Sequence, residues 1–361
     1  MHVDVAIIGA GQAGLAMAHA LQAAGLDFQV LEAGTQAGGS WSKYYDSLSL
    51  FSPAQYSALP GMAFPGDPGR YPRRNEVVDY LAAYARRFDF PIRYDAPVSS
   101  VQREALGFNV IMRNGESMQA KAVVVATGAF SSPNRPSLTG LENFKGAVLH
   151  SSEYRRPADV RGSHITVLGA GNSAVQIAYE LSADHDVTLV ARHPPVFMKQ
   201  RPLGRDIHFW LRASGFDTAP LGAWFGWRLT EAVLDQGLYQ QAFKDKKILY
   251  KPMFDRITPD GLQWGDSHQS VDSLIMATGF INKPRFLEGL DGLSAEEASR
   301  QRGGVSLAVP GLYFVGVPWQ RSHASATLRG VGPDAAVVVR HLQKQRRLSR
   351  AVTSQRREPA L

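Results

Sequence analysis

The sequence of 361 residues contains no cysteine. This absence excludes disulfide-stabilised scaffolds, thiolate metal sites, cysteine nucleophiles and dithiol relays, and it fits a reducing compartment. No apolar run approaches the ~18 residues that a membrane-spanning helix needs. The first strand is expected to start at Val3, so no signal peptide is predicted ahead of it. We therefore expect a cytoplasmic protein without a metal centre.

The excess of positive charge is confined to the C-terminal end of the chain. The formal net charge is +7, and the segment from Arg340 to Leu361 carries +6 of it, which leaves +1 for the other 339 residues. The charged residues of that segment are Arg340, Lys344, Arg346, Arg347, Arg350, Arg356, Arg357 and Glu358. The body gives no sign of a nucleic-acid partner, and the tail is predicted to be the solvated end of a helix.

Two segments share one plan of strand, glycine turn, helix and strand. Residues 3–8 form an apolar strand, and a helical pattern then runs to Gly25 before a second strand that ends on Glu32. The same plan returns over 164–192. Matching strands at 123–128 and 274–279 each end in Ala-Thr-Gly. Strands that alternate with helices predict parallel sheets covered on both faces.

The sequence therefore predicts an α/β fold with two Rossmann-like dinucleotide-binding domains, the second inserted into the first. The first domain is expected over 1–155 and 282–361, with a last strand at 312–317 and a last helix at 333–343, and the second over 156–281. Residues 199–250 fit no strand pattern and are predicted to be a helical excursion of the second domain. This excursion holds Trp210, Trp224 and Trp227, and it either covers the active site or belongs to the core.

The first glycine turn has the spacing of a dinucleotide fingerprint. Its glycines permit a tight turn, close approach of a pyrophosphate, and close packing of helix on strand, while the helix N-terminus supplies free N–H groups. Glu32, 23 residues after Gly9, is placed to accept hydrogen bonds from ribose hydroxyls and to repel a 2′-phosphate. We expect an adenine nucleotide without a 2′-phosphate on this turn, which the presence of a second nucleotide site below identifies as FAD. The expected contacts are Gly9, Gly11, Gln12, Ala13, Gly14 and Glu32.

The second turn differs in the charge that follows it. Arg192 stands 23 residues after Gly169, so the sequence places it at the register of Glu32, where it would bind a 2′-phosphate with His193 as a second donor. The alternative is a surface arginine at a strand end. We expect NADPH here, with NADH tolerated because no acid replaces the arginine. The expected contacts are Gly169, Gly171, Asn172, Ser173, Arg192 and His193.

A protein with two such sites moves hydride from a nicotinamide to a flavin. Because no cysteine is present, the disulfide reductases are excluded. Molecular oxygen or a protein electron acceptor remains as the destination of the electrons.

At residues 144–154 the chain resembles the class B flavin-containing monooxygenases. Phe144, Gly146, His150 and Tyr154 match the identifying pattern of that family, FxGxxxHxxx(Y/F). Baeyer–Villiger relatives end the pattern in Trp-Pro, whereas this chain has Tyr154-Arg155. Further matches are Gly38-Gly39-Ser40-Trp41 and Ala277-Thr278-Gly279-Phe280. By this resemblance Gly39, Trp41, Thr127, Gly128, Gly330 and Val331 are further expected FAD contacts.

The resemblance implies that NADPH reduces FAD, that oxygen adds at flavin C4a, and that a sulfide or another small soft nucleophile takes one oxygen atom. Such an enzyme needs little acid–base machinery, but it must exclude water from the flavin. A Baeyer–Villiger or N-hydroxylating relative and a reductase that serves a protein acceptor are the alternatives. The partners expected are O2 and the small nucleophile, and the oligomeric state is left open, with a homodimer as one arrangement.

One position departs from the family. Many members carry an asparagine over the flavin in the loop after the GG-x-W element, and residues 48–52 contain none. Phe51 is predicted to take its place at the flavin face, with packing in the core as the alternative. We expect no other catalytic side chain, because the cofactor supplies the chemistry.

Overall fold

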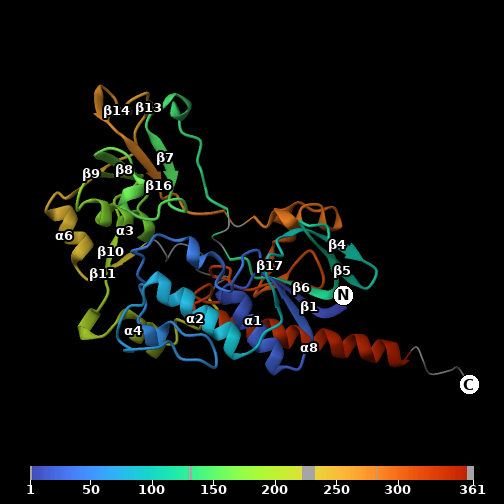
Figure 1. Cartoon of the computed structure of the whole chain (residues 1–361). Helices are drawn as coiled ribbons and strands as arrows, with labels where there is room; N and C mark the ends of the chain where they lie inside the picture. Colours follow the sequence, from blue (N-terminus) through green and yellow to red (C-terminus); the bar gives the residue numbers. More distant parts are fainter. Residues whose placement is uncertain (1, 129, 131, 222–231, 282, 356–361) are drawn as a thin grey trace, which may run out of the picture.

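Both predicted glycine turns join a strand to a helix in the computed structural model, which describes residues 2–128, 130, 132–221, 232–281 and 283–355. The two turns belong to two separate sheets, which form two lobes (Figure 1). The α/β class and the two Rossmann-like units are confirmed.

The first sheet is built from strands at both ends of the chain. Its order is β17-β18-β19-β6-β1-β2-β3, and β4 and β5 extend it through an antiparallel pairing of β5 with β6. The central strands β19, β6, β1, β2 and β3 run parallel. Their bounds are β1 His2–Ile8, β2 Phe28–Leu31, β3 Ile92–Arg93, β4 Val98–Glu104, β5 Gly107–Met112, β6 Ser117–Val125, β17 Gln301–Arg302, β18 Val305–Ser306 and β19 Leu312–Phe314.

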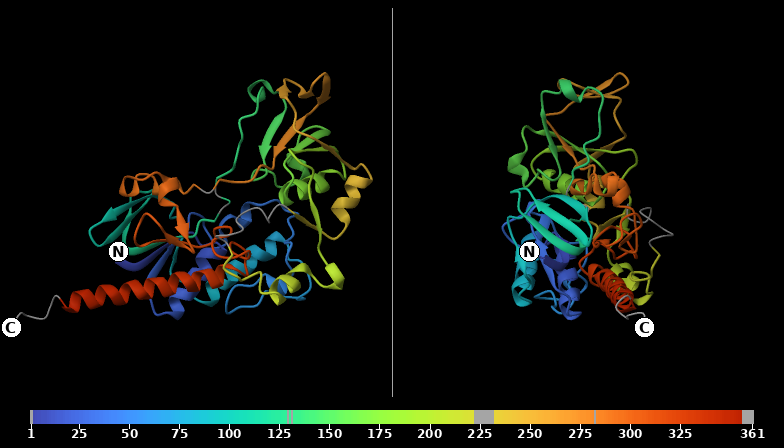
Figure 2. Two further views of the ribbon diagram at one scale, coloured as in Figure 1. Left: turned by 180° about the vertical axis from the view of Figure 1, so that it is seen from behind. Right: turned by 90° about the vertical axis from the view of Figure 1, so that its right-hand side faces the viewer.

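Helices cover one face of this sheet. The buried core there contains apolar residues of α1 (Gln12–Ala23), α2 (Arg74–Arg87) and α8 (Val331–Gln355). The other face packs under β4, β5 and the segment around α7 (Ala295–Ala298). In Figure 2, α8 lies along α1 and then projects beyond the body. The predicted last helix is thus present but begins two residues earlier and extends through Gln355.

The second sheet is wholly parallel, in the order β12-β9-β8-β16-β7. The core on one face includes α3 (Asn172–Leu181) and α6 (Leu238–Lys244), and the other face packs against an antiparallel sheet of three strands. The bounds are β7 Ala147–His150, β8 His164–Leu168, β9 Asp186–Val190, β12 Ile248–Lys251, β16 Ser273–Met276, β13 Arg256–Thr258, β14 Gly261–Trp264 and β15 Ser267–Ser270.

Two expectations about this region were wrong. The segment 147–150 was placed before the boundary at 155, yet β7 pairs with β16 and therefore belongs to the second sheet. The excursion over 199–250 is not purely helical, because β11 (Val233–Asp235) pairs in parallel with β10 (Phe197–Lys199), and β12 joins the second sheet. Strands this short leave no clear alternation in the sequence.

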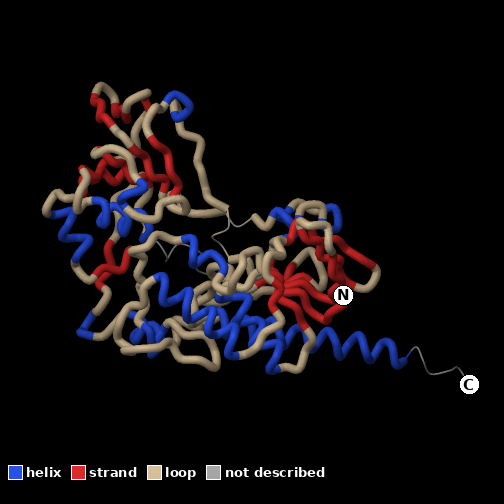
Figure 3. Tube along the Cα trace, viewed as in Figure 1, coloured by secondary structure: helices blue, strands red, loops and turns tan. Residues whose placement is uncertain are grey.

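The described part of the excursion is still an irregular, loop-rich segment (Figure 3). It contains α4 (Ile207–Ala213), which in Figure 1 lies below the second sheet, at the level of the first lobe. Trp224 and Trp227 lie outside the described residues. Among the residues that the model describes, no helix combines the length and the apolar character needed to cross a membrane.

Candidate functional site

The first glycine turn is held tightly between β1, β6 and α1. Gly9 has φ +105°, and a Cβ there would lie 2.9 Å from the Ala126 carbonyl oxygen. A Cβ at Gly14 would come within 1.8 Å of the Gly9 carbonyl oxygen. No side chain caps α1, whose N-cap is Gly11 and whose first residues are Gln12 and Ala13. The first N–H groups of the helix are thus available to a phosphate.

Glu32 is buried directly after β2, with 7% of its surface exposed. Its carboxylate accepts hydrogen bonds from the backbone N–H groups of Ala10 at 2.6 Å and Gly34 at 2.9 Å. Each oxygen keeps a second lone pair, so the carboxylate can also accept from two ribose hydroxyls. A buried acid fixed beside the glycine turn fits the adenosine half of FAD.

Two distant segments close over this turn. Gln12 accepts from the Trp41 indole N–H at 3.2 Å and donates to the Ala326 carbonyl at 2.5 Å. A Cβ at Gly39 would lie 3.0 Å from the Gly11 Cα, and a Cβ at Gly9 would lie 3.3 Å from the Thr127 Cα. The structure therefore brings the expected contacts Gly39, Trp41 and Thr127 to the first turn, with Gly128 following Thr127.

The start of α8 lies on the same side of the first sheet. A Cβ at Gly330 would lie 1.9 Å from the Ala324 carbonyl oxygen, and Val331 is fully buried. Asp334, in the first turn of α8, is also fully buried and accepts from Arg321 Nε at 2.9 Å. Burial raises the pKa of Asp334, although this arginine opposes the shift. No sequence pattern predicts this pair.

The second glycine turn repeats the geometry of the first. Gly169 has φ +138° and donates to the Val190 carbonyl at 2.8 Å, as Gly9 donates to the Leu31 carbonyl at 2.8 Å. Gly171 is the N-cap of α3, and Asn172 and Ser173 are its first residues. The Asn172 Oδ1 atom is buried and has no partner among the described residues. An unsatisfied buried acceptor beside free helix N–H groups fits a bound nucleotide.

The register assigned to Arg192 was wrong by one residue. Ile8 pairs with Leu31, and Leu168 pairs with Val190, so the structural counterpart of Glu32 is Ala191. Arg192 follows at the next position, exposed beside the exposed His193. The slip arises because α3 is two residues shorter than α1 while β9 is one residue longer than β2.

Phe51 is not a core residue, since 40% of its surface is exposed. Its ring stacks on His208 of α4 with centroids 6.1 Å apart, and its carbonyl accepts from Gln200 at 3.0 Å. His208 and Asp206 form a buried pair, 2.7 Å apart. Burial lowers the pKa of His208, which favours the neutral ring. The described part of the excursion thus reaches the loop predicted to face the flavin.

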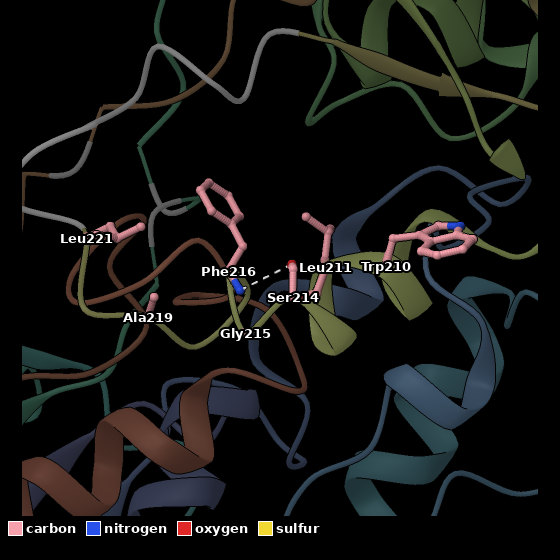
Figure 4. Close-up of a pocket in the computed structure, with 7 residues that line it drawn as sticks. All are labelled: Trp210, Leu211, Ser214, Gly215, Phe216, Ala219 and Leu221. Carbon is pink, nitrogen blue, oxygen red and sulfur yellow. Dashed lines mark hydrogen bonds between the residues drawn. The ribbon is translucent and has the colours of Figure 1, made fainter.

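A second contact fixes the excursion at the start of α8. Asp217 accepts from Arg329 Nε at 2.6 Å and from Arg329 NH2 at 2.7 Å. Figure 4 shows the stretch just before and after Asp217, where Trp210, Leu211, Phe216 and Leu221 line an open, mainly apolar cavity of about 610 Å³. Of the two alternatives for the excursion, these contacts favour a cover over the site.

The pattern at 144–154 is structural. His150 is fully buried, with its Nε2 atom 3.0 Å from the Gly279 carbonyl oxygen. The Tyr154 hydroxyl donates to Glu180 of α3 at 2.7 Å, and a Cβ at Gly146 would collide with the Phe144 ring at 2.4 Å. These residues tie β7 to β16 and α3 at the joint between the lobes.

Comparison with known proteins decides the family. A family model described as pyridine nucleotide-disulphide oxidoreductase matches residues 6–214. The flavin-containing monooxygenase from Stenotrophomonas maltophilia superposes with a TM-score of 0.82 at 32% identity, over 95% of this chain and 99% of that one. The chain belongs to the flavin-containing monooxygenase family.

Two further relatives agree with this membership. The uncharacterized oxidoreductase CzcO-like protein of Geobacillus kaustophilus is 36% identical over 93% of this chain and 97% of its own. Indole-3-pyruvate monooxygenase YUCCA1 of Oryza sativa subsp. japonica is 34% identical over 48% of this chain and 44% of its own. The monooxygenase is an oxidoreductase, and the expected cofactors, FAD and NADPH, are those of the family. Disulphide chemistry through a thiol pair is excluded because the chain lacks cysteine.

Proposed function

We propose that this monooxygenase uses NADPH and FAD to transfer one atom of O2 to sulfides or other small soft nucleophiles. The observation that carries the proposal is the contrast between the two glycine turns. The first is followed by the buried acid Glu32, and the second by Ala191 and the exposed Arg192. Opposite polarity beyond two equivalent turns supports one site for a free ribose and one for a 2′-phosphate.

The first site supplies groups that suit FAD. The turn at Gly9 and the free N–H groups of α1 would hold the pyrophosphate, and Glu32 would hold the ribose. When bound, the flavin supplies hydride acceptance and oxygen activation. The protein's own task is to orient the ring and to keep water away from it.

The second site supports NADPH despite the corrected register. Ala191 occupies the strand-end position, so no carboxylate is placed there to repel a 2′-phosphate. Arg192 has no ion-pair partner among the described residues and its guanidinium is exposed. An uncommitted guanidinium beside the turn can form a bidentate pair with a phosphate. The 2′-hydroxyl that NADH carries in place of the phosphate faces no repelling group at Ala191 or Arg192, which supports some use of NADH.

The loop around Phe51 and the excursion supply the cover that this chemistry needs. Asp206 accepts from Tyr71 at 2.5 Å and from Gln200 at 2.9 Å, so one carboxylate of the excursion binds the segment before α2. The His208 ring forms a hydrogen bond with this carboxylate and stacks on the rings of Phe51 and Tyr56. Packed aromatic rings above the site would exclude water from the flavin. We expect the reaction to take place in the cytoplasm.

An isotope experiment tests the proposal. The purified protein is incubated with NADPH and methyl phenyl sulfide under ¹⁸O2, and the molecular mass of the sulfoxide is measured by mass spectrometry. We expect one ¹⁸O atom in each sulfoxide, and one NADPH consumed for each oxygen atom transferred to the sulfide or for each molecule of hydrogen peroxide released. The matched control uses ¹⁶O2 in H2¹⁸O and should give unlabelled product.

The same assay, repeated with other acceptors and substrates, separates the alternatives. Oxidation of NADPH that requires an added ferredoxin and proceeds without O2 would support the reductase. Conversion of a cyclic ketone to a lactone with no sulfoxide from the sulfide would support the Baeyer–Villiger relative, and hydroxylation of an amine nitrogen alone would support the N-hydroxylating one.

A further inference from the structure

Asp217 fixes the excursion to the loop that precedes α8. It is buried and accepts both hydrogen bonds from Arg329, while its backbone carbonyl accepts from the N–H of Ala324 at 3.1 Å. His323 lies 3.4 Å away, from Nδ1 to Oδ1. The next carbonyl, that of Thr218, accepts from Arg321 at 3.1 Å. Five groups thus join a two-residue stretch of the excursion to one loop.

Three buried hydrogen-bond donors in this loop have no acceptor among the described residues, and one of them is the side-chain amide of Gln320. The NH1 group of Arg329 is buried and has no acceptor among the described residues, and the same holds for the indole N–H of Trp319. The Trp319 ring packs edge-on against His323, with centroids 5.4 Å apart. Buried donors without acceptors are costly, so a partner that offers acceptor atoms is expected.

The loop that carries these donors forms part of the first site. A Cβ at Gly316 would lie 2.6 Å from the Cβ of Ala13, and Gln12 donates to the Ala326 carbonyl. Trp319 and Ala326 hold φ values of +56° and +68°, in the left-handed region that side chains other than glycine rarely adopt. Backbone strain of this kind persists only where the surroundings enforce it, and it is concentrated at ligand sites.

We propose that Asp217 is a positioning residue of the flavin site, which orients Arg329 so that its free NH1 group, with the Trp319 N–H, serves acceptor atoms of the flavin pyrimidine. This inference rests on the proposed function. Because the Nε and Nη2 atoms of Arg329 both donate to the Asp217 carboxylate, the plane of the guanidinium is fixed. The Nη1 atom can then point in only one direction. The carboxylate also offsets the arginine charge near the ring.

The alternative is that Asp217 merely attaches the excursion to the body. A matched control distinguishes the two roles. Asp235 is another buried carboxylate of the excursion, and it accepts from the backbone N–H groups of Gly237, Tyr239 and Gln240 at the start of α6. Within the described part of the chain it makes no hydrogen bond or ion pair to the loop before α8. D235N therefore perturbs the excursion but leaves Arg329 untouched.

The experiment measures FAD affinity of the apoprotein by flavin fluorescence and the midpoint potential of the bound flavin by dye equilibration. Variants are D217A, D217N, R329Q, the double variant D217N/R329Q, and D235N. We expect D217A to weaken FAD binding by about tenfold or more, because the buried arginine loses its partner. D217N keeps an acceptor oxygen but loses the charge, so the midpoint potential should rise. In the R329Q background, D217N should have no further effect.

Three results would overturn the inference. These are FAD affinity in D217A equal to that in D235N, a midpoint potential in D217N equal to that of the wild type, or additive effects of D217N and R329Q. If D217A does not fold, the potential of D217N and the double variant still decide. A wild-type protein that binds no FAD would overturn the proposed function as well. A wild type that binds FAD, with Asp217 variants unchanged in FAD affinity and midpoint potential, would overturn this inference alone.

Discussion

The carboxylate of Glu32 accepts a hydrogen bond of 2.6 Å from the backbone N–H of Ala10, which lies 22 residues earlier in the chain. The same side chain accepts from Gly34, so it braces both the glycine turn and the turn after β2. The proposed role of Glu32 in FAD binding is therefore tied to the shape of the glycine turn.

Replacing Glu32 by Ala should weaken FAD binding by ~1.5–3 kcal/mol, or roughly ten- to a hundredfold. The ribose would lose a charged acceptor, and two backbone N–H groups would lose their partner. Fluorescence titration of the apoprotein measures the loss. E32Q keeps one acceptor oxygen and should lie between the wild type and E32A. An E32A protein that purifies fully yellow and retains its flavin on dilution would remove Glu32 from the FAD site.

Replacing Arg192 by Gln should raise the Michaelis constant for NADPH roughly ten- to a hundredfold and leave that for NADH nearly unchanged. Initial rates with each coenzyme test this. The control is Arg256→Gln, which removes another exposed arginine of the same lobe, on β13. Equal losses with both coenzymes would give Arg192 a structural role, and a wild type that prefers NADH would contradict the phosphate assignment.

Replacing Phe51 by Asn should lower the share of NADPH oxidation that ends as hydrogen peroxide. We expect Phe51 at the flavin face, so the amide would offer a polar partner there in place of the exposed ring, which stacks on His208. Peroxide is measured against NADPH consumed. F51L, which keeps an apolar side chain, should leave the share unchanged. Tight coupling in the wild type together with no change in F51N would place Phe51 away from the flavin.

Acid should loosen the excursion through Asp206. Burial alone would raise the pKa of this carboxyl, but hydrogen bonds from His208, Tyr71 and Gln200 outweigh burial and lower it to about 2 from the ordinary value of 3.8. A lowered folded-state pKa gives stability above the unfolded value that is lost as the pH falls through the folded one. We expect about 2 kcal/mol at neutral pH, lost between about pH 4 and pH 2.

Urea unfolding of the wild type and D206N between pH 7 and pH 2 tests this expectation. The variant should be less stable at pH 7, and the difference between the two proteins should shrink towards pH 2. A difference that stays constant over this range would show that the ionised form of Asp206 contributes nothing.

The parts of the site that the sequence predicted depend on local spacing. Gly9 and Gly169 could be recognised because each turn lies between a strand and a helix within thirty residues or so. The exact position of Arg192 could not, since small differences in helix and strand length accumulate before β9 and shift the register by one residue.

Long-range pairs left no pattern to recognise. Asp217 and Arg329 are 112 residues apart, and neither belongs to a motif. Asp206 and Tyr71 lie 135 residues apart, one in the excursion and the other in the segment before α2. Tertiary packing alone selects such pairs, so the sequence could not reveal where the excursion contacts the first lobe. Phe51 was singled out for its position in a loop, and the model places it at the contact between that loop and α4.

The two chain segments that connect the lobes are bound to each other. The backbone N–H of Asn134 donates to the Gly279 carbonyl, and Asn134 and Thr278 each donate a side-chain hydrogen bond to the other's carbonyl. The His150 ring forms a further hydrogen bond with the Gly279 carbonyl. The inserted segment therefore leaves and re-enters its host at one point. If the second lobe unfolded, its ends would already be closed into a loop, so the host would lose little chain entropy in keeping them together. The joined ends thus reduce the chain entropy that the host sheet loses by carrying an insertion of this length.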